Sequence, residues 1–168
     1  MASAKPDFAL PPQTVLHARY LLGETRGGGA VGISYRALQL DAPARGRVVA
    51  VKEFFPRALA VRAPDGSVQP MPKGAADFAL YCARFVRGYR FLHAMADFPP
   101  LVPLLDLFEE NGTAYVVMAY IEGETLAQRV KAHGAIPPRA LMRMMRPFLH
   151  DLAALHQRQI IHRAIMPR

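Results

Sequence analysis

Alternating apolar and polar residues predict three strands in the first part of the chain. Residues 20–24 lead into a cluster of glycines, and residues 33–38 alternate in the manner of a half-buried strand. Residues 47–54 form a β-branched apolar run that is typical of a third strand. An extended loop with a small hairpin is expected over residues 55–74, because prolines and an Asp65-Gly66 turn interrupt them.

The apolar spacing then becomes helical over residues 76–96, until Pro99 and Pro100 stop the helix. Two further strands are predicted at 102–108 and 113–120, joined by an Asn-Gly pair that favours a tight hairpin. Helices are expected at about 125–132 and 139–157. The second of these carries an apolar stripe made of Leu141, Met145, Phe148, Leu152 and Leu155.

Composition narrows the class of protein. A chain of 168 residues with 52% hydrophobic content can bury one core, and its lone Cys82 excludes an intramolecular disulfide. Residues 1–13 lack the apolar stretch of a signal peptide, and no apolar run approaches the roughly 18 residues that cross a bilayer. We therefore expect a cytoplasmic protein without a membrane segment.

The net charge of +8 raises the question of a nucleic-acid partner. The arginines are scattered along the chain, and no basic run is interleaved with aromatic residues as on a base-stacking surface. Solvated helix faces explain the arginines with fewer assumptions. No nucleic-acid binding is expected.

Several short segments occur in an order that is informative when they are taken together. They are L-P-P-Q-T-V-L at 10–16, G-I-S-Y at 32–35, V-K-E-F-F-P at 51–56, F-E-E-N-G-T-A-Y at 108–115, E-G at 122–123 and H-R at 162–163. In this order and spacing, the chain resembles bacterial serine/threonine protein kinases from about residue 10 to residue 168.

The resemblance implies an α+β fold. A kinase-like small lobe, with a five-stranded antiparallel sheet and one helix, would precede the first helices of a truncated large lobe. The implied divisions are an N-terminal extension at 1–18, the small lobe at 19–118, the hinge at 119–124 and an incomplete large lobe at 125–168.

Residues 27–32, G-G-G-A-V-G, fit the pattern G-x-G-x-x-G. A dinucleotide-binding loop would need a helix directly afterwards, whereas a strand is predicted here, so the kinase-type loop fits better. The resemblance implies that Gly27, Gly29 and Gly32 approach the phosphates of ATP. Val31 departs from the Phe that the family usually has at the loop tip. A flexible hairpin without a ligand remains the alternative.

Lys52 matches the lysine of the third kinase strand, which grips the α- and β-phosphates and pairs with a helical glutamate. The family pattern F-x-x-E-A falls on residues 85–89, where Gly88 takes the place of that glutamate. Two readings stay open. Lys52 either faces the pocket without a carboxylate partner or points to solvent.

The resemblance places the hinge at residues 118–121, where backbone groups would bond to adenine. Met118 would be the gatekeeper, Tyr120 would belong to the hinge, and Ala50 and Ser34 would form the roof of the pocket. The same Met118 and Ala50 are equally compatible with a collapsed pocket and an ordinary core.

The end of the chain, H-R-A-I-M-P-R at 162–168, resembles the kinase catalytic loop without its catalyst. Ala164 stands where the resemblance places the catalytic Asp, and Met166 where related bacterial kinases carry Lys. With Gly88, these are degenerate positions, so no catalytic residue is intact. The family's metal-binding residues would lie beyond Arg168, and no magnesium site is expected in this chain.

The preferred hypothesis is a catalytically impaired, pseudokinase-like signalling or scaffold protein that binds ATP weakly and transfers no phosphoryl group. One alternative is the N-terminal part of a serine/threonine kinase with ATP-binding and phosphotransferase activity. Another is a decayed fragment. Because the later helices of a large lobe are missing, the Leu141–Leu155 face is expected to bind a protein partner or a second copy.

Overall fold

The computed structural model describes residues 8–42, 46–95, 102–161 and 165–166. The chain divides into two compact units, Met1–Ile121 and Glu122–Arg168, so the boundary lies within the expected hinge segment. Each unit is described by itself below.

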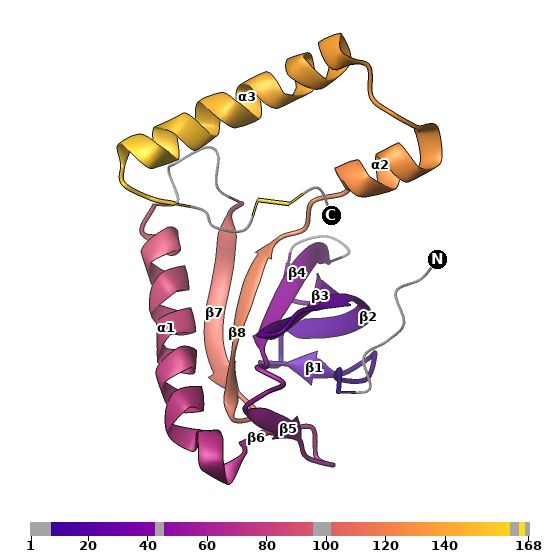
Figure 1. The fold of residues 1–168 in the computed structure, drawn as a ribbon. Helices are drawn as coiled ribbons and strands as arrows, with labels where there is room; N and C mark the ends of the chain where they lie inside the picture. Colours follow the sequence, from indigo (N-terminus) through magenta and orange to yellow (C-terminus); the bar gives the residue numbers. More distant parts are fainter. Residues whose placement is uncertain (1–7, 43–45, 96–101, 162–164, 167–168) are drawn as a thin grey trace. The chain divides into compact units, whose positions relative to one another are not determined.

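In the described part of the first unit, the strands form a six-stranded antiparallel sheet and a small hairpin (Figure 1). The hairpin expected between residues 55 and 74 is present, and helix α1 lies beside β7. The sheet order is β1 (Val15–Leu16), β2 (Tyr20–Gly28), β3 (Gly32–Gln39), β4 (Arg47–Phe54), β8 (Thr113–Ala119) and β7 (Leu104–Glu110), while β5 (Ala60–Arg62) pairs with β6 (Val68–Pro70).

The expectation of five strands in the main sheet is wrong by one, because β1 pairs with β2. Backbone bonds continue this pairing, from Gln13 N–H to the Leu22 carbonyl and from Leu22 N–H to the Thr14 carbonyl, both 2.8 Å long. Leu16 is fully buried and anchors the strand. A two-residue strand is too short to show a periodicity, which explains why the sequence pattern does not reveal it.

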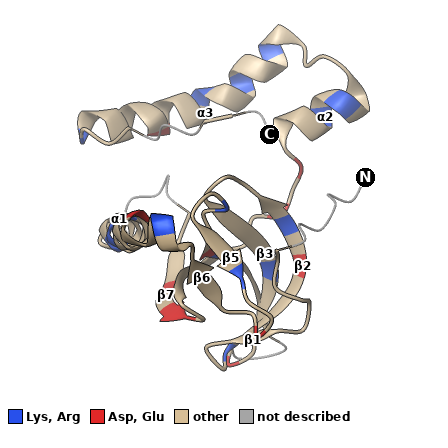
Figure 2. Ribbon diagram, turned by 60° about the horizontal axis from the view of Figure 1, so that its bottom comes forward, with Lys and Arg blue, Asp and Glu red and all other residues tan. Residues whose placement is uncertain are grey.

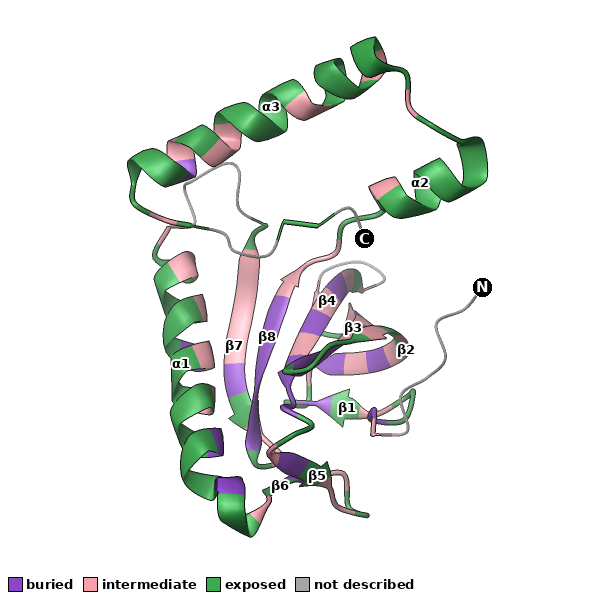
Figure 3. Ribbon diagram, in the orientation of Figure 1, coloured by how far each residue is buried: buried purple, intermediate pink, exposed green. Residues whose placement is uncertain are grey.

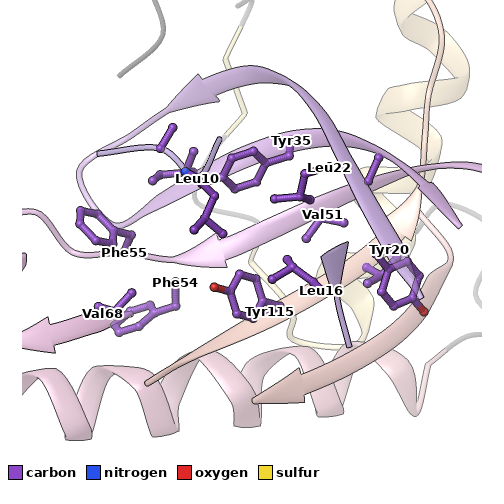
Figure 4. Close-up of a cluster of buried hydrophobic side chains, with 14 of the residues drawn as sticks. Leu10, Leu16, Tyr20, Leu22, Tyr35, Val51, Phe54, Phe55, Val68 and Tyr115 are labelled. Atoms are coloured by element: carbon purple, nitrogen blue, oxygen red, sulfur yellow. The ribbon is translucent and has the colours of Figure 1, made fainter. Parts of the chain in front are cut away.

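One face of the sheet carries most of the hydrophobic core. Figure 3 shows buried and partly exposed residues alternating along β4, as the two-residue period of a strand requires. Figure 4 shows Tyr35, Val51 and Tyr115 gathered in this core, together with Leu10 from the segment before β1. The residues preceding the sheet are therefore part of its packing.

The 3₁₀ turn Pro72–Gly74 leads into helix α1 (Ala75–His93), which contacts β7 and β8. The rings of Phe78 and Phe85 pack against Phe54 of β4, at centroid distances of 5.4 and 5.3 Å. The helix expected at 76–96 is thus present and ends a few residues earlier, where the Ala94 and Met95 amides bond in a tight final turn.

The second unit contains helix α2 (Leu126–His133) and helix α3 (Pro138–Gln157), close to the ranges expected from the sequence. Thr125 and Gln128 form a reciprocal capping box at the start of α2, which satisfies two backbone N–H groups. Gly134 ends α2 with a φ of 78°, a value that favours glycine. Among the described residues, no helix has the length and apolar character to cross a membrane.

Candidate functional site

The face of β4 opposite Val51 and Glu53 carries several of the residues that the sequence analysis selected. In the strand register, Ser34 of β3 lies opposite Lys52 of β4, and Ala50 lies opposite Met118 of β8. Because side chains alternate along a strand, Ala50 and Lys52 lie on one face of β4, and Val51 and Glu53 lie on the other. Ala50, Lys52 and Met118 are all partly exposed. The first unit therefore brings these three predicted site residues together.

The glycine cluster forms the hairpin turn between β2 and β3. The Gly29 amide donates to the Gly32 carbonyl at 2.8 Å, and the Phe55 amide donates to the Val31 carbonyl at 3.1 Å. A Cβ atom added at Gly27 or Gly29 would meet no atom within 4 Å, so the space beside these glycines is open. Val31, the tip residue, is 60% exposed.

Gly32 has a different role in the same hairpin. An added Cβ atom would lie 2.6 Å from the Glu53 carbonyl oxygen and 3.7 Å from Cε of Lys52. Glycine thus allows β3 to approach β4 closely beside Lys52. Gly27 favours glycine for another reason, because its φ is positive at 156°.

Lys52 is partly buried and directed to Tyr89 of α1. Its ammonium group donates a hydrogen bond to the Tyr89 hydroxyl at 3.1 Å, and Nζ lies 5.7 Å from the centre of the Tyr89 ring. Among the residues that the structure describes, no carboxylate pairs with Lys52. The side chain is directed to a neutral aromatic partner and not to solvent.

Gly88, which the motif places at the glutamate position, is exposed on α1, and an added Cβ atom would meet nothing within 4 Å. The next residue, Tyr89, faces the sheet and packs on Phe85 at a ring distance of 4.8 Å. Sequence reasoning missed Tyr89. The helical spacing of Cys82, Phe85 and Tyr89 was the signal that would have placed it on the inner face.

Two arginines near the site were also missed. The guanidinium groups of Arg26 on β2 and Arg36 on β3 lie 5.9 and 5.7 Å from the centre of the Tyr120 ring, directly after β8. Figure 2 shows the Lys and Arg segments of β2 and β3 in blue. Strand alternation places Arg36 on the same face as Ser34, which was a readable signal. Glu24, 81% exposed, lies 3.8 Å from Arg26.

The groups around Lys52 differ from the usual ligands of Mg²⁺. Mg²⁺ is usually held by carboxylate and water oxygens in octahedral geometry. Here the Lys52 ammonium group bonds to the Tyr89 phenol, and the guanidinium groups of Arg26 and Arg36 lie at the Tyr120 ring. Within the described ranges, no cluster of three or more His, Cys, Asp or Glu side chains can hold a metal ion. This donor set suits an anion better than a hard cation.

Glu53, next to Lys52 on β4, is fully buried on the core face. Its carboxylate accepts hydrogen bonds of 2.7 Å from Tyr35, 2.9 Å from Tyr115 and 2.7 Å from two nitrogens of Arg62. Burial, followed by the negative charge of Glu53, raises the pKa of both tyrosines. Arg62 also bonds to the Phe8 carbonyl at 3.0 Å, so this network ties the N-terminal segment to β4.

Only two residues of the predicted catalytic loop, Ile165 and Met166, are among the described residues. His162, Arg163 and Ala164 lie outside the described residues, and Met166 is 50% exposed in the second unit. The apolar stripe of α3 is partly exposed, with Leu141 and Phe148 each at 37%, whereas Leu155 is buried. Association with a protein partner through this stripe stays a prediction.

Comparison with known proteins points to one family. The model of the protein kinase domain matches residues 20–168. The chain is 31% identical to serine/threonine-protein kinase pkn2 of Myxococcus xanthus, over 94% of this chain and 16% of that protein. It is 27% identical to serine/threonine-protein kinase PknA of Nostoc sp., over 92% of this chain and 25% of the relative.

Among solved structures, the apo form of PpkA-294 matches with a TM-score of 0.84 and 28% sequence identity. The match covers 96% of this chain and 56% of that one. The chain therefore spans a quarter or less of these curated relatives and about half of the similar structure.

Proposed function

This chain belongs to the protein kinase family, and we propose that it binds a nucleoside polyphosphate without transferring its phosphoryl group. Its role would then be signalling or scaffolding through binding. The observation that carries the proposal is the pairing of Lys52 with the neutral Tyr89, where a working kinase has a carboxylate.

Three features support nucleotide binding. Ala50 and Met118 lie opposite each other and offer an apolar surface of the kind that an adenine ring contacts. Lys52 retains donors for a phosphate, because its ammonium group has three and the described structure directs one to Tyr89. The space beside Gly27 and Gly29 is open to a phosphate chain.

The lost groups argue against transfer. Phosphoryl transfer depends on positioning and on neutralising the charge that develops on the phosphoryl oxygens. Ala164 has no proton acceptor for the attacking hydroxyl, and Met166 supplies no cation. Tyr89 does not form the ion pair that fixes the lysine in active kinases.

Thermal unfolding of the purified chain, with and without ATP or ADP, tests the proposal. Nucleotide is expected to raise the melting temperature of the natural chain, because a ligand that binds the folded state stabilises it. The Lys52→Ala variant should melt cooperatively but respond little. Incubation with labelled ATP and a mixed protein substrate should leave no label on either protein. A natural chain that melts cooperatively but ignores both nucleotides would contradict the proposal.

A second candidate is the N-terminal part of an active serine/threonine kinase. It is favoured by the retained glycine motif and Lys52, and by relatives that are themselves serine/threonine kinases and much longer than this chain. Label transfer that disappears in Lys52→Ala would establish this candidate instead. A decayed fragment would show no cooperative unfolding transition at all.

A further inference from the structure

We infer, resting on the proposed nucleotide site, that this site selects the polyphosphate as a free anion over its magnesium complex. Tyr89 is the residue that sets this preference. The ligand class is a nucleoside di- or triphosphate without a bound metal ion.

The first step concerns the charge of Lys52. A glutamate partner would cancel most of the lysine charge before any ligand arrives, whereas a tyrosine hydroxyl only accepts a hydrogen bond. The bond from Lys52 to Tyr89 is 3.1 Å long and only partly buried. Lys52 is thus held in place while its full positive charge remains available to a phosphate.

The second step concerns the arginines that share the Tyr120 ring. Arg26 and Arg36 lie 5.9 and 5.7 Å from its centre and add two positive charges to this part of the sheet. Arg36 is on the strand that pairs with β4, opposite Ala50. Glu24 offsets part of the Arg26 charge, but it is strongly exposed and 3.8 Å away. Arg26 and Arg36 therefore leave positive charge beside Tyr120 that Glu24 offsets only in part.

The third step concerns the ligand. A bound divalent ion removes roughly two negative charges from a polyphosphate, and such an ion is often the largest local charge in a site. Carboxylates in a site attract that ion, whereas cations without counter-charges repel it. Lys52 bonds to a phenol and pairs with no carboxylate among the described residues, and Arg36 adds a cation on the neighbouring strand opposite Ala50, so the uncomplexed anion fits better.

Calorimetric titration of the whole chain with ATP tests this, once in excess EDTA and once in excess Mg²⁺. The natural chain is expected to bind ATP at least about fivefold more tightly in EDTA, a modest change in binding free energy. Adenosine and tripolyphosphate serve as separate probes. Weak binding of both probes indicates a nucleotide ligand, whereas tripolyphosphate that matches ATP shows that the same anion preference acts without the base.

Matched variants isolate the charge at position 89. Tyr89→Glu and Tyr89→Gln both lose the ring contacts with Phe85 and Lys52, and they differ only in the carboxylate. Tyr89→Glu should abolish the preference for metal-free ATP, and Tyr89→Gln should keep it. Arg36→Gln should reduce the preference. Arg84→Gln, which removes an exposed charge elsewhere on α1, should leave it unchanged.

The outcomes separate this inference from the proposed function. Equal or tighter binding of the magnesium complex by the natural chain overturns the inference and leaves nucleotide binding intact. Absence of ATP binding in both buffers overturns the proposed function and the inference with it. If Tyr89→Glu keeps the same preference as Tyr89→Gln, then Tyr89 does not set it. Melting curves of all the variants confirm that each is folded.

Discussion

Lys52 and Glu53 are neighbours on β4, yet their surroundings are opposite in character. Glu53 is fully buried and accepts short hydrogen bonds from Tyr35, Tyr115 and Arg62. Lys52 is partly exposed and bonds to the hydroxyl of Tyr89 at 3.1 Å. The comparison teaches that one strand separates two tasks. The face with Glu53 holds a closed hydrogen-bond network, and the other face, where Phe54 packs on α1, leaves the charge of Lys52 partly exposed.

The difference follows from the physical cost of burying charge. A buried carboxylate must be paired and hydrogen-bonded, because desolvation of an unpaired ion costs several kcal/mol or more. A partly exposed lysine carries no such requirement, since water satisfies the donors that the protein leaves open. The fully bonded Glu53 thus stabilises the fold, whereas the unused donors of Lys52 can bond to a ligand.

The largest expected effect is on the core face. Glu53→Gln should lower the free energy of unfolding by about 3–5 kcal/mol, because Arg62 then remains largely buried without its counter-charge. Urea unfolding followed by circular dichroism measures this loss. Lys52→Gln is the matched control on the opposite face and should cost less than about 1 kcal/mol. Equal losses of unfolding free energy for both variants would show that Glu53 and Lys52 do not differ in their contribution to stability.

A second variant tests the close approach of β3 and β4 at Gly32. Gly32→Ala should lower the free energy of unfolding by about 1–3 kcal/mol, because the new methyl group would sit 2.6 Å from the Glu53 carbonyl oxygen. Gly29→Ala, in the same hairpin, meets no atom within 4 Å and should change stability by less than about 0.5 kcal/mol. Similar stabilities of the two variants would show that β3 can move away from β4 without cost.

The smallest expected effect is on pH dependence. Burial and the charge of Glu53 raise the pKa of Tyr35 above its ordinary value of 10.0, so the folded state favours the protonated hydroxyl. Its contribution is complete below pH 10 and is lost as the pH rises further. Between neutral pH and about pH 10.5, the natural chain should lose about 0.8 kcal/mol more than Tyr35→Phe. Parallel losses in urea unfolding at both pH values would show that the hydroxyl is not part of this linkage.

Much of the fold follows from local patterns. The helix α1 and the strands β3 and β4 are readable from apolar periodicity, and the Asn-Gly pair marks the turn between β7 and β8. By contrast, β1 has only two residues and depends on pairing with β2. Arg62 gave no sequence signal at all, because its partner Glu53 lies across a loop and on another strand.

The candidate site divides in the same way. The glycine motif and Lys52 were identified from motifs that resemble those of kinases, and the structure places one of its glycines, Gly32 of β3, beside Lys52 of β4. The motif directed attention to Gly88, but the orientation of α1 turns the next residue, Tyr89, toward the lysine. The helical spacing of Cys82, Phe85 and Tyr89 indicates that Tyr89 lies on the inner face, but its contact with Lys52 is decided by how the helix packs on the sheet.

The sequence by itself determined most of the elements and the family resemblance, because each of these depends only on residue type and local spacing. That Ala164 stands in place of a catalytic aspartate is what this resemblance implies. The tertiary structure alone decided which polar groups meet. Lys52 and Tyr89 are 37 positions apart, and Glu53 and Tyr115 are 62 positions apart. Contacts between residues so far apart in the sequence are set by the packing of the whole unit. This packing buries the charge of Glu53 in the core and leaves the charge of Lys52 partly exposed.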